Sequence, residues 1–343
     1  MEEEIIRAVK WKKDKHPKKI LVIRFQATGD MVATLPYIQY LRNSLPKDTL
    51  IDFLVREEAE SIPKSLHLFD QIYSIKGGRR VKKQLFWLIL LLPELISNGY
   101  DVVLDLQNHP LSRLARKVIN PECWTEFDKF SPRHGCERYR RTINEARFID
   151  SKPDYNYVLK NKELGLDILK SHGWNGTDKL VVLNPAGYFI TRNWDLDNYV
   201  EFCKLFHKKY QDGIKFLVMG LPKIKEKAVY FKQKLGDSLI DITCKTTAAE
   251  AFSIIQRIHF MVSEDSGLFH MSYLSGKPSI GILGSTREDW VNPRLPHTFC
   301  FTSSHLPCGN CMEATCKVNT LECMKGVTPE MVFQQAIILL NEK

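Results

Sequence analysis

Residues 20–36 read ILVIRFQATGDMVATLP, and this stretch decides the fold class. The run 20–25 is apolar apart from Arg24 and has the length of a buried strand. The loop QATGD follows it, and a helix is expected from there to Leu45. A strand that is apolar on both faces and leads directly into a helix is typical of a parallel sheet covered on both sides.

The same alternation of strand and helix continues along the chain. Further strands are expected at 50–55, 71–75 and 101–106, and a helix at 84–97 that Pro93 should break or kink. A second series runs from the strand 179–184 to the strand 279–283, after a helix at 160–172 and a turn-rich segment at 173–178. We therefore predict an α/β protein with two doubly wound domains, 1–175 and 176–325, and a helical C-terminal segment, 326–343.

Composition narrows the class of protein. The 343 residues include 49 Lys and Arg against 40 Asp and Glu, a formal net charge of +9, which favours an anionic partner. The N-terminal residues lack the apolar core of a secretory signal, and the longest apolar run, 85–92, is too short to span a bilayer. Nine cysteines in such a chain predict reduced thiols or metal ligands in the cytoplasm.

The first candidate site residues follow the first strand, because ligands of open α/β sheets bind where strands end and helices begin. Thr28, Gly29 and Asp30 occupy this position, and Gly29 permits close approach of a ligand. Asp30 stands at the expected helix start, where aspartate is also a favoured cap. With one glycine and no Gly-Lys-Ser/Thr ending, the segment is neither a dinucleotide fingerprint nor a Walker loop.

Polar residues also follow the strands of the second half. Asp265, Ser266 and Gly267 precede a helix whose free amide groups and dipole would favour a diphosphate. For His270, one turn further on, packing and ligand contact are equally good interpretations. Gly187, Arg192 and Thr286 lie in loops that would suit a phosphate, although a plain surface turn is the alternative. Together these residues predict a nucleotide-type ligand.

The motifs resemble those of glycosyltransferase family 9, the lipopolysaccharide heptosyltransferases. The N-terminal match is the stretch 20–36 quoted above, and the C-terminal match is VSEDSGLFHMSYLSGKPSIGILGST at 262–286. Residues 184–194 resemble the family's stretch between Pro-x-Gly and a basic residue two before Trp. Residues 308–324 resemble a cysteine-rich tail of many members.

The resemblance implies a GT-B fold, in which two Rossmann-like domains face a central cleft. The first domain would bind the acceptor and the second the nucleotide sugar, and the final helix would cross back toward the first domain. The implied reaction is an inverting transfer, without a catalytic metal or other cofactor, of heptose from ADP-heptose to a lipopolysaccharide core acceptor. Asp30 matches the catalytic base, and Arg192 matches a basic residue, often lysine, that grips donor phosphate. The donor-binding motif is matched by Asp265, Ser266, Gly267 and His270.

The acceptor side is less specific. An anionic glycolipid is implied, and its acidic sugars would suit a group of arginines in the first domain: Arg133, Arg138, Arg140 and Arg141. Basic residues between 76 and 83 precede the apolar run 85–92. This segment predicts either a buried helix with a charged approach or a peripheral contact with the inner membrane through Trp87 and Leu88.

Four cysteines near the C-terminus form a separate cluster. Cys308, Cys311, Cys316 and Cys323 are spaced C-x2-C-x4-C-x6-C, which suits a structural zinc or iron ion but is not the spacing of a common zinc finger. Reduced thiols packed in a loop are the alternative.

Other functions stay open at this point. A basic, metal-containing nucleic-acid-binding protein would explain the charge and the cysteines. No strand interleaves aromatic and basic residues as a single-strand platform requires, so no nucleic-acid partner is expected. A GT-B enzyme with another nucleotide-sugar donor, or a sugar-nucleotide epimerase, is the remaining alternative.

Overall fold

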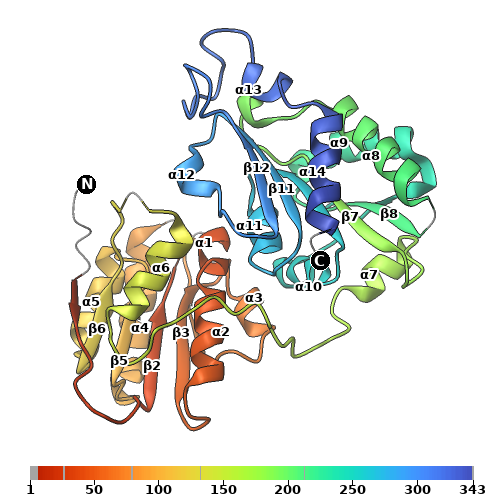
Figure 1. The fold of residues 1–343 in the computed structure, drawn as a ribbon. Helices are drawn as coiled ribbons and strands as arrows, with labels where there is room; N and C mark the ends of the chain where they lie inside the picture. Colours follow the sequence, from red (N-terminus) through yellow and green to blue (C-terminus); the bar gives the residue numbers. More distant parts are fainter. Residues whose placement is uncertain (1–6, 26–27, 79, 132, 212, 342–343) are drawn as a thin grey trace. The chain divides into compact units, whose positions relative to one another are not determined.

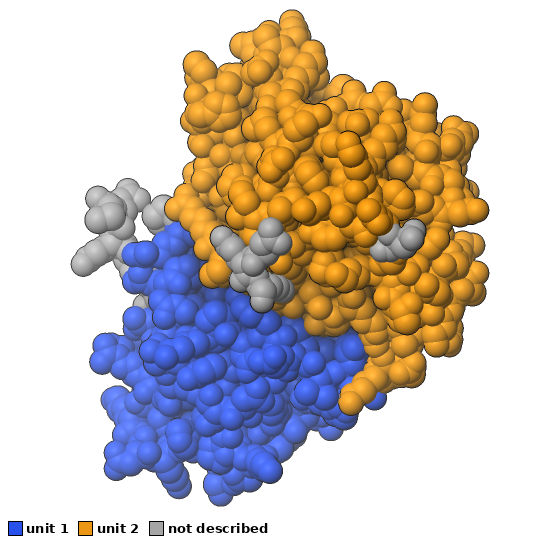
Figure 2. Space-filling model, turned by 45° about the vertical axis from the view of Figure 1, so that its right-hand side comes forward, with its two compact units in different colours: residues 1–160 blue, residues 161–343 orange. Residues whose placement is uncertain are grey.

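The computed structural model describes residues 7–341 except 26–27, 79, 132 and 212 (Figure 1). It divides into two compact units, Met1–Lys160 and Asn161–Lys343 (Figure 2). Among the described residues each unit contains one six-stranded sheet flanked by helices. The predicted α/β class with two doubly wound domains is confirmed.

The sheet of the first unit has the strand order β1-β6-β5-β2-β3-β4. Its central strand β2 (Lys19–Ile23) is parallel to β3 (Leu50–Arg56) and β5 (Val102–Asp105), and β4 (Ile72–Ile75) and β6 (Cys123–Glu126) continue the parallel pairing. The short strand β1 (Arg7–Val9) is antiparallel to β6. Residues 20–23 are fully buried, as expected for a strand covered on both faces.

Helices cover both faces of this sheet. Helices α4 (Val81–Ser97) and α5 (Pro110–Ile119) pack side by side on one face, and α2 (Leu35–Ser44) and α6 (Gly135–Asn144) lie on the other (Figure 1). The short helices α1 (Thr28–Val32) and α3 (Ser61–Lys64) follow β2 and β3. Helix α1 therefore starts at the carboxyl edge of the sheet, where the first candidate residues were expected.

The sheet of the second unit has the order β12-β11-β10-β7-β8-β9 and is parallel throughout. Its strands are β7 (Lys179–Asn184), β8 (Ile214–Val218), β9 (Leu239–Asp241), β10 (Phe260–Glu264), β11 (Ser279–Gly284) and β12 (Thr298–Thr302). The longer helices are α8 (Leu196–Tyr210), α9 (Lys225–Leu235), α10 (Ala248–Ile255) and α14 (Pro329–Asn341); shorter ones are α7 (Leu166–Ser171), α11 (Gly267–Tyr273), α12 (Glu288–Val291) and α13 (Glu322–Lys325). Single 3-10 turns stand at η1 (Ile190–Arg192), η2 (Pro222–Ile224) and η3 (Gly236–Ser238).

The division between the units falls at residue 160, fifteen residues before the boundary expected from the sequence. Residues after 160 belong to the second unit because they pack on α10. Ser253 donates a hydrogen bond of 2.8 Å to the carbonyl of Leu164, and Gly165, at φ 79°, lies against Ile254. The helix expected at 160–172 is correspondingly shorter, since α7 begins only after Gly165.

The last helix packs within the second unit. Val332, Ala336 and Leu339 of α14 are buried in that unit's core, and the helix contacts α8, β11 and β12. The sequence analysis expected the segment 326–343 to cross back toward the first domain. The apolar face of α14 packs in the core of the second unit.

Two further local expectations are corrected. Helix α4 continues through Pro93 without interruption, from Val81 to Ser97. Pro93 removes the hydrogen bond to the carbonyl of Ile89, and both residues face solvent, where water can satisfy that carbonyl. The strands β1, β6 and β12 were missed, because they are short, mixed in polarity and lie at or next to a sheet edge.

Among the helices that the structure describes, none has the length and apolarity needed to cross a membrane.

Candidate active site

The first group of site residues surrounds Arg24, which directly follows β2. Arg24 is only 5% exposed, and its Nη1 donates a hydrogen bond of 2.8 Å to the carbonyl of Leu106. Its guanidinium lies 5.7 Å from the ring centroid of Phe127 and 5.2 Å from that of Tyr139. These two rings stack on each other at 4.8 Å. Arg24 is thus a fixed, buried cation with one nitrogen directed at Asp30.

Asp30 is held by two donors. Its Oδ2 lies 2.9 Å from Nη2 of Arg24, and its Oδ1 accepts a hydrogen bond of 3.2 Å from the Tyr139 hydroxyl. Burial, followed by the charge of Asp30, raises the pKa of Tyr139, so the phenol remains a proton donor. Because 52% of the Asp30 side chain is still exposed, the carboxylate is oriented and yet accessible to a reactant.

The expectation that Asp30 caps a helix does not match its position, since α1 already begins at Thr28. Thr28 and Gly29 form the first turn of α1 beside it. The residues 26–27, which complete the expected loop, lie outside the described part of the chain. Asp30 is therefore a side chain within α1 that is turned toward Arg24 and α6.

The four arginines proposed for the acceptor lie on or just before α6, in different surroundings. Arg138 stands over the Phe127 ring at 5.2 Å and donates to the carbonyl of Lys129, so it is close to the Arg24 group. Arg140 forms two hydrogen bonds with Glu137, of 2.8 and 2.7 Å, and is already paired with an acid. Arg133 precedes the helix and Arg141 lies in its last turn. Arg138 is thus the member best placed beside Asp30.

The second group of site residues converges on Asp265, which follows β10. Its Oδ2 accepts hydrogen bonds from Nη1 of Arg192 at 3.0 Å and from the hydroxyl of Thr286 at 2.8 Å. Three residues predicted from separate strand ends therefore meet in space. They come together because β7, β10 and β11 are adjacent in the sheet and their carboxyl ends share one edge.

Arg192 is a buried residue and not a mobile arm on a surface turn. It is 9% exposed, lies 4.9 Å from the ring centroid of Phe189, and contacts the sulfur of Met312 at 3.5 Å through Nη2. Its Nε has no hydrogen-bond partner among the described residues. A buried guanidinium donor without an acceptor suits an anionic ligand at this position.

Ser266, Gly267 and His270 begin the helix α11. Ser266 is the N-cap, since its hydroxyl accepts from the amide of Phe269, and it also accepts from the side chain of Asn184. Gly267 has no atom within 4 Å of the position that a Cβ would occupy. Nδ1 of His270 lies 2.6 Å from the hydroxyl of Tyr273, so packing accounts for one face of this ring.

Glu264 is a central residue that the sequence analysis missed. It is fully buried and accepts hydrogen bonds from the amides of Gly187 at 2.6 Å and Trp194 at 2.7 Å. Burial raises the pKa of Glu264 to about 7, although Lys227, 4.0 Å away, and the two amides act in the opposite direction. Glu264 could have been selected as a site residue because it lies next to Asp265 at the end of a strand. Its hydrogen bonds to the amides of Gly187 and Trp194, however, could not be predicted from the sequence.

Gly187 has a structural role in this arrangement. A Cβ at this residue would lie 2.2 Å from the carbonyl oxygen of Arg192 and 2.9 Å from the Glu264 carboxylate. The loop that carries Arg192 can therefore fold against β10 only with glycine at 187. The sequence analysis expected Gly187 at the phosphate, and its observed contacts are with the protein itself.

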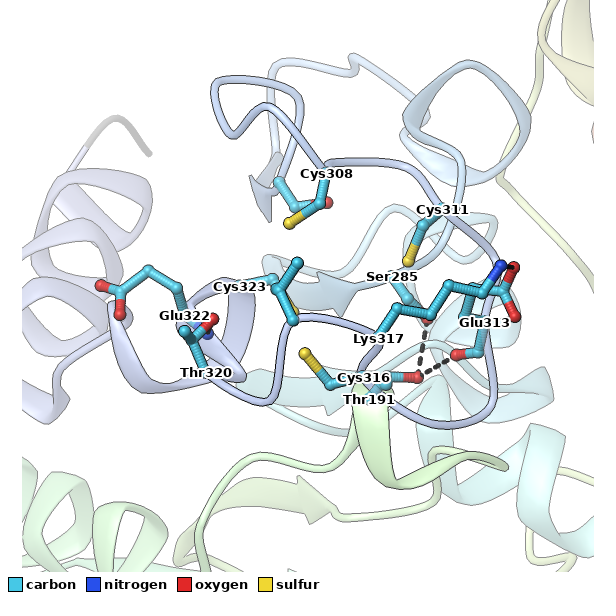
Figure 3. Close-up of a pocket in the computed structure, with 12 residues that line it drawn as sticks. Thr191, Ser285, Cys308, Cys311, Glu313, Cys316, Lys317, Thr320, Glu322 and Cys323 are labelled. Carbon is cyan, nitrogen blue, oxygen red and sulfur yellow. Dashed lines mark hydrogen bonds and ion pairs between the residues drawn. The ribbon is translucent and has the colours of Figure 1, made fainter.

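The four cysteines of the C-terminal cluster line one cavity of about 130 Å³ (Figure 3). Burial, followed by the charges of Cys311, Cys316 and Cys308, raises the pKa of Cys323, whereas backbone amides, that of Leu321 first, lower the pKa of Cys316. The described residues contain no group of three or more His, Cys, Asp or Glu side chains in position to hold a metal ion.

The cysteine loop also contacts the Arg192 segment. The hydroxyl of Thr191 bonds to Ser285 at 2.9 Å and to the carbonyl of Glu313, and the amide of Met312 donates to the carbonyl of Ser285 at 2.8 Å. Because Met312 also contacts Arg192, the loop supports the side of the site that Arg192 occupies.

Known proteins resemble this chain in sequence and in fold. The family model of glycosyltransferase family 9 (heptosyltransferase) matches residues 91–322. Lipopolysaccharide heptosyltransferase 1 of Campylobacter coli is 24% identical over 293 residues, which cover 78% of this chain and 84% of that protein. A family 9 glycosyltransferase from Veillonella parvula superposes with a TM-score of 0.77 at 18% identity, covering 95% of this chain and 98% of its own. The E. coli heptosyltransferase WaaC, solved with ADP-2-deoxy-2-fluoro heptose, gives a TM-score of 0.66 at 18% identity, covering 93% and 99%. The family match spans most of the chain, and the solved relatives share the fold of both units, so the chain belongs to glycosyltransferase family 9, the heptosyltransferase family, and is a glycosyltransferase of the GT-B fold.

Proposed function

We propose that the protein transfers heptose from ADP-heptose to a lipopolysaccharide core acceptor, with inversion, without a catalytic metal, and with Asp30 as the general base. The observation that carries this proposal is the arrangement around Asp30. A buried arginine and a buried tyrosine fix both carboxylate oxygens, while about half of the side chain stays exposed. A half-exposed carboxylate fixed in this way at a sheet edge suits proton transfer better than it suits packing.

The chemical step follows from these positions. An acceptor hydroxyl is a weak nucleophile, so Asp30 removes its proton as the oxygen attacks the anomeric carbon. The new carbon–oxygen bond forms opposite the bond to the diphosphate, whose electron pair leaves with ADP, and the anomeric centre is inverted. The proton ends on Asp30, and the products are the glycosylated acceptor and ADP.

The leaving diphosphate gains negative charge in the transition state, and the second unit supplies the groups that stabilise it. Arg192 is the cation, and Asp265 and Thr286 hold its guanidinium and the neighbouring loop in place. Ser266 and Gly267 stand at the start of α11, where the open space beside Gly267 allows close approach of a ligand. We assign acceptor binding to the first unit, beside Thr28, Gly29 and Arg138, and donor binding to the second.

The choice of donor and acceptor rests on the relatives. WaaC binds an ADP-heptose analogue, and the Campylobacter relative is named for lipopolysaccharide. Lipopolysaccharide core sugars are anionic, which suits a chain with a net charge of +9. We place the reaction in the cytoplasm, on an acceptor held at the inner membrane.

A nucleotide screen tests the donor assignment. Thermal denaturation would be compared in ADP, UDP, GDP and CMP, and ADP should stabilise selectively, by about 2.7 kcal/mol at a hundredfold excess over Kd. Transfer from ADP-heptose should then persist in EDTA. Stabilisation by another nucleotide would mean a GT-B enzyme with a different donor, and salt-dependent DNA binding without a nucleotide response would favour the nucleic-acid alternative.

We also propose that Cys308, Cys311, Cys316 and Cys323 bind a structural zinc or iron ion. All four thiols line the same cavity, and closing them onto one ion would fix the loop that contacts Arg192 (Figure 3). Elemental analysis of freshly purified protein should find about one metal ion per chain. Cys316→Ser should lose the ion and weaken ADP binding, whereas Cys244→Ser should do neither; protein free of metal and with normal ADP affinity would remove this proposal.

A further inference from the structure

The outer stripe of α4 is apolar although it faces solvent. Phe86, Ile89 and Leu90, spaced as neighbours on one helix face, are 58%, 53% and 55% exposed, and Ile96 continues the stripe at 46%. The opposite side of α4 enters the core through Leu88 and Leu95, which are fully buried. A helix that is apolar all round indicates a second apolar surrounding besides the protein core.

The sequence analysis named Trp87 and Leu88 as membrane-facing, and the structure corrects this choice. Leu88 is fully buried. Trp87 packs against the core, with the ammonium of Lys76 4.9 Å from its ring centroid. The residues that face outward are their neighbours in the sequence, Phe86, Ile89 and Leu90.

Helix α5 lies beside α4 on the same face of the sheet (Figure 1). A basic hollow is lined in part by residues of α5. Arg7, Arg113, Arg116 and Lys117 line this hollow of about 300 Å³, together with Trp124 and Glu126. Arg116 is paired with Glu126 and lies 3.7 Å from the ring centroid of Trp124. Arg7, Arg113 and Lys117 form no ion pair with a described residue. With Asp105, whose Oδ2 lies 3.8 Å from Nε of Arg116, four cations stand against two acids, and the hollow keeps a net positive charge.

Cations also border the apolar stripe at its other end. Lys82 and Lys83 occupy the first turn of α4 and are exposed, and Val118 of α5 is a further exposed apolar side chain, at 40%. One acidic residue of α4, Glu94, lies near the C-terminal end of the helix and is exposed. Apolar side chains bordered by lysine and arginine are the composition of a helix that lies in the boundary of an anionic bilayer.

We propose that this α4–α5 face docks on an anionic phospholipid membrane, with Phe86, Ile89 and Leu90 entering the headgroup boundary and the basic hollow holding lipid phosphates. A protein partner would have to present acidic side chains to the four cations and a large apolar area to the stripe. An anionic membrane supplies both features, through its headgroups and its acyl chains. This inference rests on the proposed function: docking on a membrane serves the reaction because the glycolipid acceptor is held in that membrane.

Vesicle co-sedimentation of the full chain tests the proposal. The wild type should sediment with phosphatidylcholine vesicles that contain about one quarter phosphatidylglycerol, and only weakly with phosphatidylcholine alone, because the surface cations are attracted to anionic headgroups. Phe86→Glu with Ile89→Glu, and separately Arg113→Glu with Lys117→Glu, should each weaken binding at least about tenfold.

Matched controls lie on the second unit. Val229→Glu on α9, where valine is 49% exposed, and Lys208→Glu with Lys209→Glu on α8 make the same chemical changes away from this face. They should leave vesicle binding unchanged, and all variants should keep the melting temperature and the ADP affinity. Equal binding by face variants and controls would overturn the proposal, as would a Phe86→Glu variant that only converts a dimer to a monomer.

A transfer assay separates this inference from the proposed function. The face variants should glycosylate a deacylated, water-soluble core oligosaccharide at the wild-type rate and lose activity on the same acceptor embedded in vesicles. Vesicle binding without any transfer from ADP-heptose would contradict the proposed function alone. Normal transfer to both acceptors by the face variants would contradict the membrane inference alone.

Discussion

Arg24 and Asp30 form an ion pair of 2.9 Å in which the cation is buried and the carboxylate is half exposed. The arginine is fixed by the carbonyl of Leu106 and by two aromatic rings, so its position does not depend on Asp30. Arg24 therefore orients the Asp30 carboxylate, and Asp30 is not needed to hold Arg24 in place. The carboxylate on the short helix α1 gains a fixed orientation from a residue anchored at the end of β2.

Asp30→Asn should retain the fold and lose activity. The amide keeps the shape of the side chain but cannot accept the acceptor's proton, so we expect kcat to fall by about 10²–10⁴. Single-turnover transfer with saturating donor would measure this, alongside the melting temperature and ADP affinity, which should stay near wild type. Undiminished turnover in this variant would refute the assignment of the base.

Tyr139→Phe should lower kcat by a smaller factor. The change removes the 3.2 Å hydrogen bond to Asp30 and leaves the stacking on Phe127 in place. A hydrogen bond of this kind contributes about 0.5–1.5 kcal/mol, so a loss of roughly two- to tenfold is expected, in kcat and not in KM for the donor. Tyr210→Phe on α8 is the matched control and should have no effect on kcat.

Arg192→Ala should weaken ADP binding. If the guanidinium donates to the diphosphate, the loss of a hydrogen bond to a charged group is worth about 1.5–3 kcal/mol, or roughly ten- to hundredfold in Kd. Isothermal titration would measure the change, and Arg192→Lys should restore part of the affinity. Arg294→Ala, at an exposed ion pair with Glu288, is the control; equal Kd values for the two alanine variants would exclude Arg192 from donor binding.

Glu264 should make the stability of the protein depend on pH. Its pKa is raised by burial from the ordinary 4.5 to about 7, so between these values the folded chain binds more protons here than the unfolded chain. The free energy of unfolding should therefore fall as pH rises from about 4.5 to about 7, by about 3 kcal/mol in all, and level off above.

Denaturant unfolding across this pH range would measure the slope. Glu264→Gln should abolish that part of the slope, because the amide does not titrate. Glu201→Gln on the exposed face of α8 should preserve it. The same slope in the Glu264→Gln variant would show that the carboxylate is not the group responsible.

Two glycines should respond differently to alanine. Gly187→Ala places a methyl group 2.2 Å from the carbonyl of Arg192 and should cost about 1–3 kcal/mol of stability. In Gly267→Ala the added methyl group has no atom within 4 Å, so the stability of the folded chain should stay unchanged. The affinity for ADP should fall if the diphosphate approaches the backbone at this residue. Thermal denaturation and titration of both variants would check the contrast, and a stable Gly187→Ala protein would contradict it.

The sequence alone determined the alternation of strands and helices and the polar residues at strand ends. These features depend on local periodicity and on the order of residues. The alternation along the chain was therefore sufficient to predict two doubly wound domains, and the stretches 20–36 and 262–286 to select Asp30 and Asp265. The family resemblance added their roles. The same local signals were too weak for β1, β6 and β12, whose short edge pairings depend on neighbours distant in the chain.

Which side chains meet could not be predicted from the sequence and was seen first in the folded chain. The pairing of Asp265 with Arg192 and Thr286, the fixing of Asp30 by Arg24 and Tyr139, and the burial of Glu264 all join residues from different strand–helix units. The exposed face of α4 was equally unreadable, because a helix that is apolar all round has no periodic signal to show which side enters the core. The physical reason is common to these cases: sequence periodicity fixes the direction of a side chain relative to its own helix or strand, whereas its partners and its burial depend on which elements the sheet order places beside it.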